Sequence, residues 1–384
     1  MAKTKDEVRV EALTILRKYQ RGGAGISMGV GKTRLGLDHF QLVVNKVKMD
    51  LNRKAKGLVV APTLKILKGW LAETKKWNMQ HLDSGLEFVT YRSLTKKNVN
   101  DYDVIYLDEC HSLKDNHDYW LGHFGGYIIG LTGTPPKRKN TEKSRMVNKY
   151  CPIRYEYLID EAVDDKILND YKIVVHLLTL GQSKDFKVEL KSNHKDPKQR
   201  TVIKSWYTSE TENYAYWTGA LNDEDSFVVK RKLSVLRMKS MQKYLSKDRY
   251  AKKLLEQATA KCLLFANEQA QADRLCTHSY HANNKDSEAN MEKFEDGRIT
   301  KLACVLQLSE GANIVGLEEI IIMHAYGNNR KAAQRIGRAL RLSVGETSTT
   351  HVLCFKNTID VQWVKEALAE FNQEKIEWYD PDIF

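Results

Sequence analysis

The run Ser27-Met28-Gly29-Val30-Gly31-Lys32-Thr33 constrains this chain more than any other stretch of its sequence. Its glycines let backbone N–H groups turn inward around a phosphate, and a helix starting after them points its positive end at the same anion. In such loops the lysine reaches the β- and γ-phosphates and the hydroxyl after it holds Mg²⁺. Ile26 stands where the full motif has its first glycine. The residues predicted to bind the phosphates are Gly29, Val30, Gly31, Lys32, Thr33 and Arg34, with Thr33 also on the metal.

A second candidate element is the apolar run 102–107, which ends in Asp108-Glu109-Cys110-His111. Continuous apolar runs are typical of buried parallel strands, and open α/β sheets carry their chemistry at the carboxyl ends of such strands. We predict that Asp108 holds Mg²⁺ through water and that Glu109 orients and deprotonates an attacking water. Taken alone, the tetrapeptide is also compatible with an acidic turn that has no catalytic role.

The rest of the first half alternates between helical and strand patterns. Residues 8–19 and 64–77 have apolar positions at helical spacing, while 57–63, 87–91 and 127–131 are short apolar runs. The last of these runs into Thr132-Gly133-Thr134, a turn rich in hydroxyl groups. The small run 22–26 is expected to be a flexible lead into the phosphate loop. This alternation predicts a doubly wound parallel α/β domain.

Length and composition limit the number of domains, the kind of partner and the cellular location that can be expected. A chain of 384 residues is long for one compact core, so two domains are expected. Lys plus Arg number 61 against 49 Asp plus Glu, a net charge of +12 that suits a polyanion such as nucleic acid, although a basic protein without such a partner remains the alternative. The six cysteines form no Cys-x-x-Cys pair, and no signal peptide or membrane-spanning run is visible. We expect a cytoplasmic protein with no membrane partner.

The second half contains four strand candidates, at 261–266, 302–306, 318–323 and 351–355, and one basic helix candidate at 334–341. Gln334, Arg338 and Arg341 are separated by helical steps and share one face of that helix. Planar, permanently charged arginine side chains suit the spread charge of a transferring phosphoryl group. We therefore predict that this face carries arginine fingers.

Between the halves, residues 181–255 are charged and locally aromatic, and we expect a mostly helical insertion. Its aromatic side chains suit base stacking, although packing is the more common role of such residues. The predicted domains are a first lobe at 1–155, a connector with insertion at 156–258, and a second lobe at 259–384.

Five motifs of the first half stand in the order found in superfamily 2 helicases, and this resemblance extends over nearly the whole chain. They are the sequences at 28–33, 60–63, 90–94, 108–111 and 132–135, which resemble motifs I, Ia, Ib, II and III. Residues 309–314 resemble motif V and 334–341 motif VI, and 155–173 resembles the connector of phage helicases and restriction-type translocases. The resemblance implies two RecA-like domains in tandem.

The resemblance also implies roles for individual residues. Arg338 and Arg341 would be the fingers, with Gln334 near the attacking water. Coupling between nucleotide and nucleic acid would pass through His111, Thr132 and Thr134. The nucleic-acid contacts would be Thr63, Tyr91, Arg92, Ser309 and Asn313.

The function expected from the resemblance is an ATP- and Mg²⁺-dependent helicase or translocase. Within this superfamily the motifs resemble those of Snf-type translocases and compact phage branch-migration helicases. Duplex or branched DNA is therefore the favoured partner, and single-stranded DNA is an alternative. An RNA helicase, or the motor subunit of a restriction or defence complex with a protein partner, is a further alternative; a monomer is expected otherwise. Arg9 and Val10 stand where this family carries an adenine-reading glutamine, which leaves nucleotide selectivity open.

Overall fold

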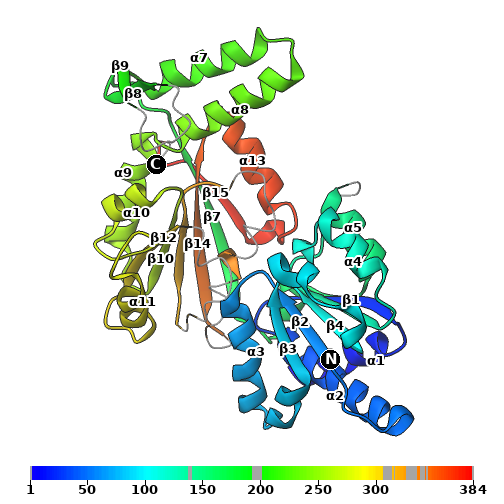
Figure 1. The fold of residues 1–384 in the computed structure, drawn as a ribbon. Coiled ribbons are helices and arrows are strands. Elements are labelled where there is room, and N and C mark those ends of the chain that lie inside the picture. The colour runs from blue at the N-terminus through cyan, green and yellow to red at the C-terminus, as the bar shows by residue number, and fades with distance from the viewer. Residues whose placement is uncertain are drawn as a thin grey trace.

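The computed structural model describes residues 2–136, 141–192, 201–305, 314, 316–325, 335–337, 342 and 345–382. Two parallel sheets dominate these residues, each covered by helices, and a helical pair projects from the second one (Figure 1). The expectation of two α/β domains with parallel sheets is therefore confirmed.

The first sheet has six strands in the order β3-β2-β4-β5-β1-β6, all parallel. Its strands are β1 (Arg21–Ile26), β2 (Gly57–Ala61), β3 (Leu86–Thr90), β4 (Val104–Asp108), β5 (Tyr127–Thr132) and β6 (Ile153–Tyr157). The accompanying helices are α1 (Lys5–Leu16), α2 (Lys32–Leu51), α3 (Leu64–Lys76), α4 (Asp118–Gly122) and α5 (Glu142–Tyr150).

Alternate residues of these strands face opposite helix layers. Val59 and Tyr106 share one core with α2 and α3, whereas Leu58 and Ile105 share another with α5. Because both faces are covered, the strands are apolar throughout, as the runs in the sequence predicted.

The glycine run expected to be flexible is instead the inner strand β1, between β5 and β6. A Cβ atom at Gly23 would lie 2.7 Å from the Cys151 carbonyl oxygen, and one at Gly25 would lie 2.4 Å from the Pro135 ring. The glycines therefore allow neighbouring segments of the chain to pack closely. The flexibility of glycine in isolation does not predict this role.

The second sheet has seven parallel strands in the order β11-β12-β10-β13-β14-β7-β15. Its strands are β7 (Asp170–Leu178), β10 (Cys262–Ala266), β11 (Ser279–Tyr280), β12 (Lys301–Val305), β13 (Glu319–Ile322), β14 (Thr347–Phe355) and β15 (Ile376–Tyr379). Helices α9 (Leu245–Gln257) and α10 (Gln269–Leu275) share one core with it, and α11 (Ser287–Glu295) and α13 (Ile359–Leu368) share the other.

The strand β7 changes the expected domain division. It lies in the second sheet, paired with β14 over nine residues, although the sequence analysis placed it in a separate connector. Its sequence, DYKIVVHLL, is a nearly continuous apolar run of the kind that predicts a buried parallel strand. The connector between the sheets is therefore short and contains α6 (Ile159–Asp164).

The insertion is mostly helical, as expected, and also contains a pair of strands. It begins with the antiparallel pair β8 (Phe186–Lys191) and β9 (Val202–Thr208), followed by α7 (Glu210–Asn222) and α8 (Phe227–Met241). The Tyr214 hydroxyl accepts the Ile359 N–H at the start of α13 with an N···O distance of 2.9 Å, which ties α7 to the second lobe. No helix in the described part of the chain is long and apolar enough to cross a membrane.

Candidate active site

The phosphate loop joins β1 to α2 and has the backbone that an anion-binding loop requires. Gly29 has φ +86° and Gly31 φ +121°, values that residues with a side chain rarely adopt. Helix α2 begins at Lys32 behind Gly31, which has no side chain to cap the first turn. The N–H groups of that turn therefore have no side-chain cap, which is the arrangement that a bound anion requires.

Strand β4 delivers a carboxylate to the lysine of this loop. Glu109 follows β4 directly, and its Oε1 lies 3.3 Å from Lys32 Nζ. Both side chains are largely buried, at 14% and 12% exposure. Glu109 has φ +49°, in the left-handed region, where a residue with a side chain is strained by about 1–3 kcal/mol. Backbone strain of this kind is typical of functional positions, since the surrounding fold must hold it in place.

Two further predicted residues join the same group. The Thr132 hydroxyl donates to Glu109 Oε2 at 3.2 Å, and His111 Nδ1 lies 2.9 Å from the Thr132 oxygen. The Thr134 N–H donates to the same Thr132 oxygen at 3.1 Å. The structure therefore brings Lys32, Glu109, Thr132 and His111 into one connected cluster at the carboxyl ends of β4 and β5.

Asp108 lies beside this cluster in a separate set of contacts. Trp70 Nε1 donates to Asp108 Oδ2 at 2.9 Å, and the Glu109 N–H donates to Oδ1 at 3.0 Å. Burial, with the neighbouring Glu109 charge, raises the pKa of Asp108 to about 6. Burial, the largest single influence on Glu109, acts in the same direction, but the charges of Lys32 and His111 and the hydrogen bonds from Lys32 and Thr132 together hold the Glu109 pKa below its ordinary value.

Trp70 contacts the predicted metal ligand Asp108, and the sequence analysis did not identify it. Its ring packs against Gly36 so closely that a Cβ atom there would lie 2.3 Å from Cη2. A glycine inside a predicted helix lowers its stability by about 1 kcal/mol and commonly has a packing reason. Gly36 was thus the signal that α3 places a large side chain against α2, next to Asp108.

The residues present fit a magnesium nucleotide. Ser27 Oγ is buried in the loop and has no hydrogen-bond partner among the described residues. A Cβ atom at Gly133 would lie 2.8 Å from Lys32 Nζ, so the glycine keeps the space around the ammonium open. The described residues contain no cluster of three or more His, Cys, Asp or Glu side chains that could hold a metal alone. Mg²⁺ keeps several waters and is bound through one or two carboxylates and substrate phosphates, and Asp108 is the carboxylate predicted for it.

Arg34 does not join the loop with its side chain. Its guanidinium pairs with Asp38 at 2.9 Å and lies 4.8 Å from the Trp77 ring centroid. Only its N–H, in the first turn of α2, remains available to a phosphate.

The predicted nucleic-acid contacts of the first lobe separate into two groups. Thr63 caps α3 by accepting the Ile66 N–H, and Arg92 is exposed. Tyr91, in contrast, is 7% exposed, and its hydroxyl donates to the Asp108 carbonyl oxygen at 3.0 Å. The expectation that Tyr91 contacts nucleic acid does not fit this burial, because the side chain supports the end of β4 from inside the domain.

Five predicted residues of the second lobe, Ser309, Asn313, Gln334, Arg338 and Arg341, lie outside the described residues. Their neighbour Arg335 is described. It is 4% exposed, and its Nη1 donates to the His324 carbonyl oxygen at 3.2 Å. Arg335 itself is therefore anchored beside β13.

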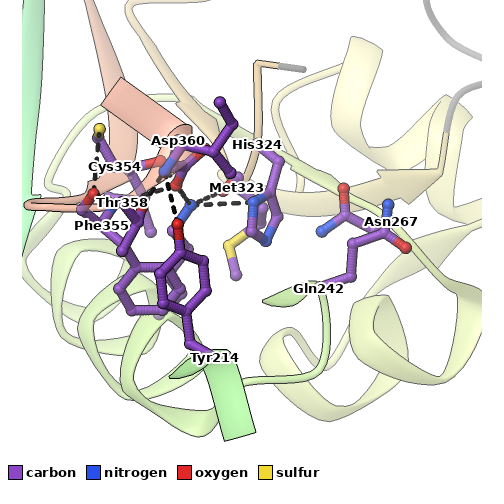
Figure 2. Close-up of polar contacts among 12 residues, drawn as sticks. Tyr214, Gln242, Asn267, Met323, His324, Cys354, Phe355, Thr358 and Asp360 are labelled. Carbon is purple, nitrogen blue, oxygen red and sulfur yellow. Dashed lines mark hydrogen bonds and ion pairs between the residues drawn. The ribbon is translucent and has the colours of Figure 1, made fainter. Parts of the chain in front are cut away.

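A buried lysine lies near the same anchor and was not foreseen from the sequence. Lys247 of α9 lies 2.5 Å from Asp360 of α13, with side-chain exposures of 1% and 0%. Its Nζ also donates to the carbonyl oxygens of Met323 and Leu353, and lies 2.9 Å from His324 Nδ1. Figure 2 shows Asp360 and His324 directed toward this shared point from different elements. Burial and the charge of Lys247 hold the His324 pKa well below its ordinary value, so the neutral ring accepts a hydrogen bond from the ammonium.

Comparison with known proteins agrees with this geometry. Residues 246–343 match the helicase conserved C-terminal domain. The chain is 23% identical over 379 residues to the DNA 3'-5' translocase XPB2 of Sulfurisphaera tokodaii, covering 89% of this chain and 80% of that protein.

Two solved structures of restriction enzymes share the fold. A fragment assigned as an HsdR subunit of a type I restriction enzyme from Vibrio vulnificus YJ016 aligns with a TM-score of 0.62 at 15% identity, over 98% of this chain and 68% of that one. The ATP-dependent type ISP restriction-modification enzyme LlaBIII bound to DNA aligns with a TM-score of 0.60 at 13% identity, over 100% of this chain and 32% of that one.

The matched domain and the homology indicate a nucleic-acid-dependent ATPase of helicase superfamily 2, and the two parallel-sheet domains are the tandem RecA-like architecture of that class. The chain spans about a third of LlaBIII, so the activities of that larger enzyme are not transferred to it.

Proposed function

We propose that this chain is an ATP-dependent motor that moves along or remodels duplex or branched DNA. The observation that carries the proposal is the connected cluster of Lys32, Glu109, Thr132 and His111 at the edge of the first sheet. The homology to a protein named as a DNA 3'-5' translocase, with the net charge of +12, supports DNA as the polymer.

We assign the nucleotide roles from the sequence motifs and the cluster. The loop N–H groups and Lys32 would bind the phosphates, and Thr33, with Asp108 acting through water, would hold Mg²⁺. Bound ATP and Mg²⁺ supply the transferable phosphoryl group and the neutralisation of its charge. Glu109 accepts a proton from the attacking water.

The ion pair suggests how hydrolysis is limited to the loaded site. Lys32 is the largest influence that lowers the Glu109 pKa. When Lys32 turns to a phosphate, Glu109 loses this partner and becomes a stronger base. The carboxylate is therefore a weak base until the phosphate is in place.

Glu109 is also connected to the turn after β5. Its Oε2 accepts from Thr132, which contacts His111 and the Thr134 N–H. A shift of the carboxylate changes these three contacts together. We assign Thr132, Thr134 and His111 to the coupling of nucleotide state with DNA grip, and Thr63 and Arg92 to the DNA side.

In the second lobe we assign Ser309 and Asn313 to DNA and Arg338, Arg341 and Gln334 to the γ-phosphate and attacking water. The proposed division is a first lobe that carries the nucleotide loop, and a second lobe that supplies the fingers, with the insertion projecting from it. Phosphate contacts position a protein without reading sequence, so binding should be independent of sequence and sensitive to salt.

The test is steady-state ATP hydrolysis with no polymer and with duplex DNA, forked DNA, single-stranded DNA and RNA at matched low salt, combined with displacement of a triplex-forming strand from duplex DNA. Duplex or forked DNA is expected to stimulate hydrolysis, and ATP to drive displacement. Glu109→Gln is the matched control, because it keeps the size of the side chain and removes the base. Stimulation by RNA alone would overturn the choice of DNA, and hydrolysis unaffected by any polymer would overturn the motor assignment.

A further inference from the structure

Exposed large apolar side chains concentrate on the insertion. Of the 19 found among the described residues, nine lie between residues 202 and 236. Soluble proteins rarely expose apolar side chains in one contiguous group unless that surface has a binding role. Helix α8 carries four of them, Phe227, Val228, Val235 and Leu236, at 80%, 63%, 41% and 44% exposure.

The exposed residues of α8 form one continuous face. At 3.6 residues per turn they fall within about half of the helix circumference and extend over about 18 Å along its axis. Figure 1 shows α8 beside α7 at the top of the molecule, beyond the edge of the second sheet. We call this set the α8 face; its members are Phe227, Val228, Arg231, Lys232, Val235, Leu236 and Lys239.

The opposite side of α8 faces the protein. Arg237 donates to the Thr218 hydroxyl of α7 and lies over the Tyr214 ring, and Met241 is fully buried in the core of the second lobe. The α8 face is therefore not needed to attach the helix, and substitutions on it can be made without opening a core.

The charge of the α8 face has one sign. Arg231, Lys232 and Lys239 are exposed, and none forms an ion pair within the described residues. Helix α8 contains no acidic residue, although Glu224 and Asp225 precede it. Three unpaired cations interleaved with apolar side chains are complementary to a polyanion that also presents apolar surface. A second copy of the same face would bring like charges together.

Single-stranded DNA has this combination, since its phosphates are accompanied by exposed base faces. A duplex keeps its bases stacked inside and would leave Val228, Val235 and Leu236 facing a hydrated backbone. We propose that the α8 face binds an unpaired DNA strand, with Arg231, Lys232 and Lys239 on phosphates and Phe227 stacked on a base. This proposal rests on the proposed function, because remodelled branched DNA supplies the unpaired strand.

The test compares two variants with equal loss of charge. Arg231→Gln/Lys232→Gln/Lys239→Gln removes the cations of the α8 face, and Lys18→Gln/Lys48→Gln/Lys54→Gln removes three exposed cations of the first lobe. Anisotropy titrations of the full chain with a labelled single-stranded oligonucleotide and a matched duplex are made over a range of salt. The α8 variant is expected to lower the slope of log K against log salt for the single strand by about 2, at roughly 0.7 per lost phosphate contact, and the control to leave it unchanged.

A second variant, Phe227→Ser/Val235→Ser, tests the apolar contribution at two exposed positions of the α8 face. It is expected to weaken single-strand binding several-fold and leave duplex binding and polymer-free ATP hydrolysis unchanged. Equal slopes for the α8 and control variants would overturn the proposal while leaving the motor function standing. Equal losses on single strand and duplex would overturn the single-strand assignment, and a changed oligomeric state in sedimentation of the serine variant would assign the face to protein contact instead. A wild-type chain that binds no DNA would overturn both proposals.

Discussion

Each lobe contains a largely buried lysine–carboxylate pair near the carboxyl ends of its strands, Lys32–Glu109 and Lys247–Asp360, and the two pairs are built differently. In the first lobe Lys32 and Glu109 are 3.3 Å apart, partly exposed, and meet at a strained backbone position. In the second lobe Lys247 and Asp360 are 2.5 Å apart and fully enclosed, and Lys247 also contacts two carbonyl oxygens and His324.

The number of partners separates an exchangeable pair from a permanent one. An ammonium has three protons to donate, and Lys247 has four acceptors around it, so no other ligand can improve its environment. Lys32 has Glu109 as its carboxylate, Gly133 places no side chain against the ammonium, and a phosphate can replace Glu109 as the partner. One pair therefore suits nucleotide binding and the other holds α9, α13 and the ends of β13 and β14 together.

The largest expected effect concerns the exchangeable pair. Lys32→Ala should lower ATP turnover by roughly 10³-fold, since the charge that stabilises the transferring phosphoryl group is lost. Its midpoint in urea unfolding should stay closer to that of wild type than the midpoint of Lys247→Ala does, because Lys32 and Glu109 keep 12% and 14% exposure and water can reach the remaining carboxylate. Steady-state ATP hydrolysis measures the turnover, and urea titration measures the unfolding midpoint. Near-normal turnover would contradict the role of the loop.

The permanent pair should show the opposite pattern. Lys247→Ala is expected to lower the free energy of unfolding by about 3–5 kcal/mol, because it leaves the Asp360 carboxylate buried without its cation. Urea unfolding monitored by tryptophan fluorescence measures the change. The double variant Lys247→Met/Asp360→Leu should recover most of the loss, since it removes both charges and keeps the volume filled. If the double variant were as unstable as the single one, the charge argument would be wrong and packing would account for the effect.

A smaller effect concerns the pH dependence of Mg²⁺ binding in the first lobe. The pKa of Asp108 is raised to about 6, so its carboxyl group is charged above that pH and becomes neutral below it. The Mg²⁺ concentration that half-saturates ATP hydrolysis should therefore be constant above pH 7 and rise by roughly tenfold per pH unit below pH 6. Asp108→Asn should require a high Mg²⁺ concentration for half-saturation at every pH. A rise of the same size in Asp108→Asn would place the titrating group elsewhere.

Much of the active site could be predicted from local sequence. The phosphate loop, Asp108, Glu109 and Thr132 were found because glycine spacing and polar residues after apolar runs are local signals, and parallel strands bring their ends together. Tyr91 was assigned to nucleic acid, yet it is buried under β4. A motif position does not indicate which way a side chain points.

The sequence by itself determined the two-lobed α/β architecture, the nucleotide loop and the carboxylates, because each depends on residues close together in the chain. Only the tertiary structure decided that the glycine run is an inner strand, that β7 belongs to the second sheet, and that Lys247 meets Asp360 across 113 positions. These features depend on which distant segments pack together. Residues throughout the core contribute to the free energy of that packing, so no single segment of the sequence predicts it.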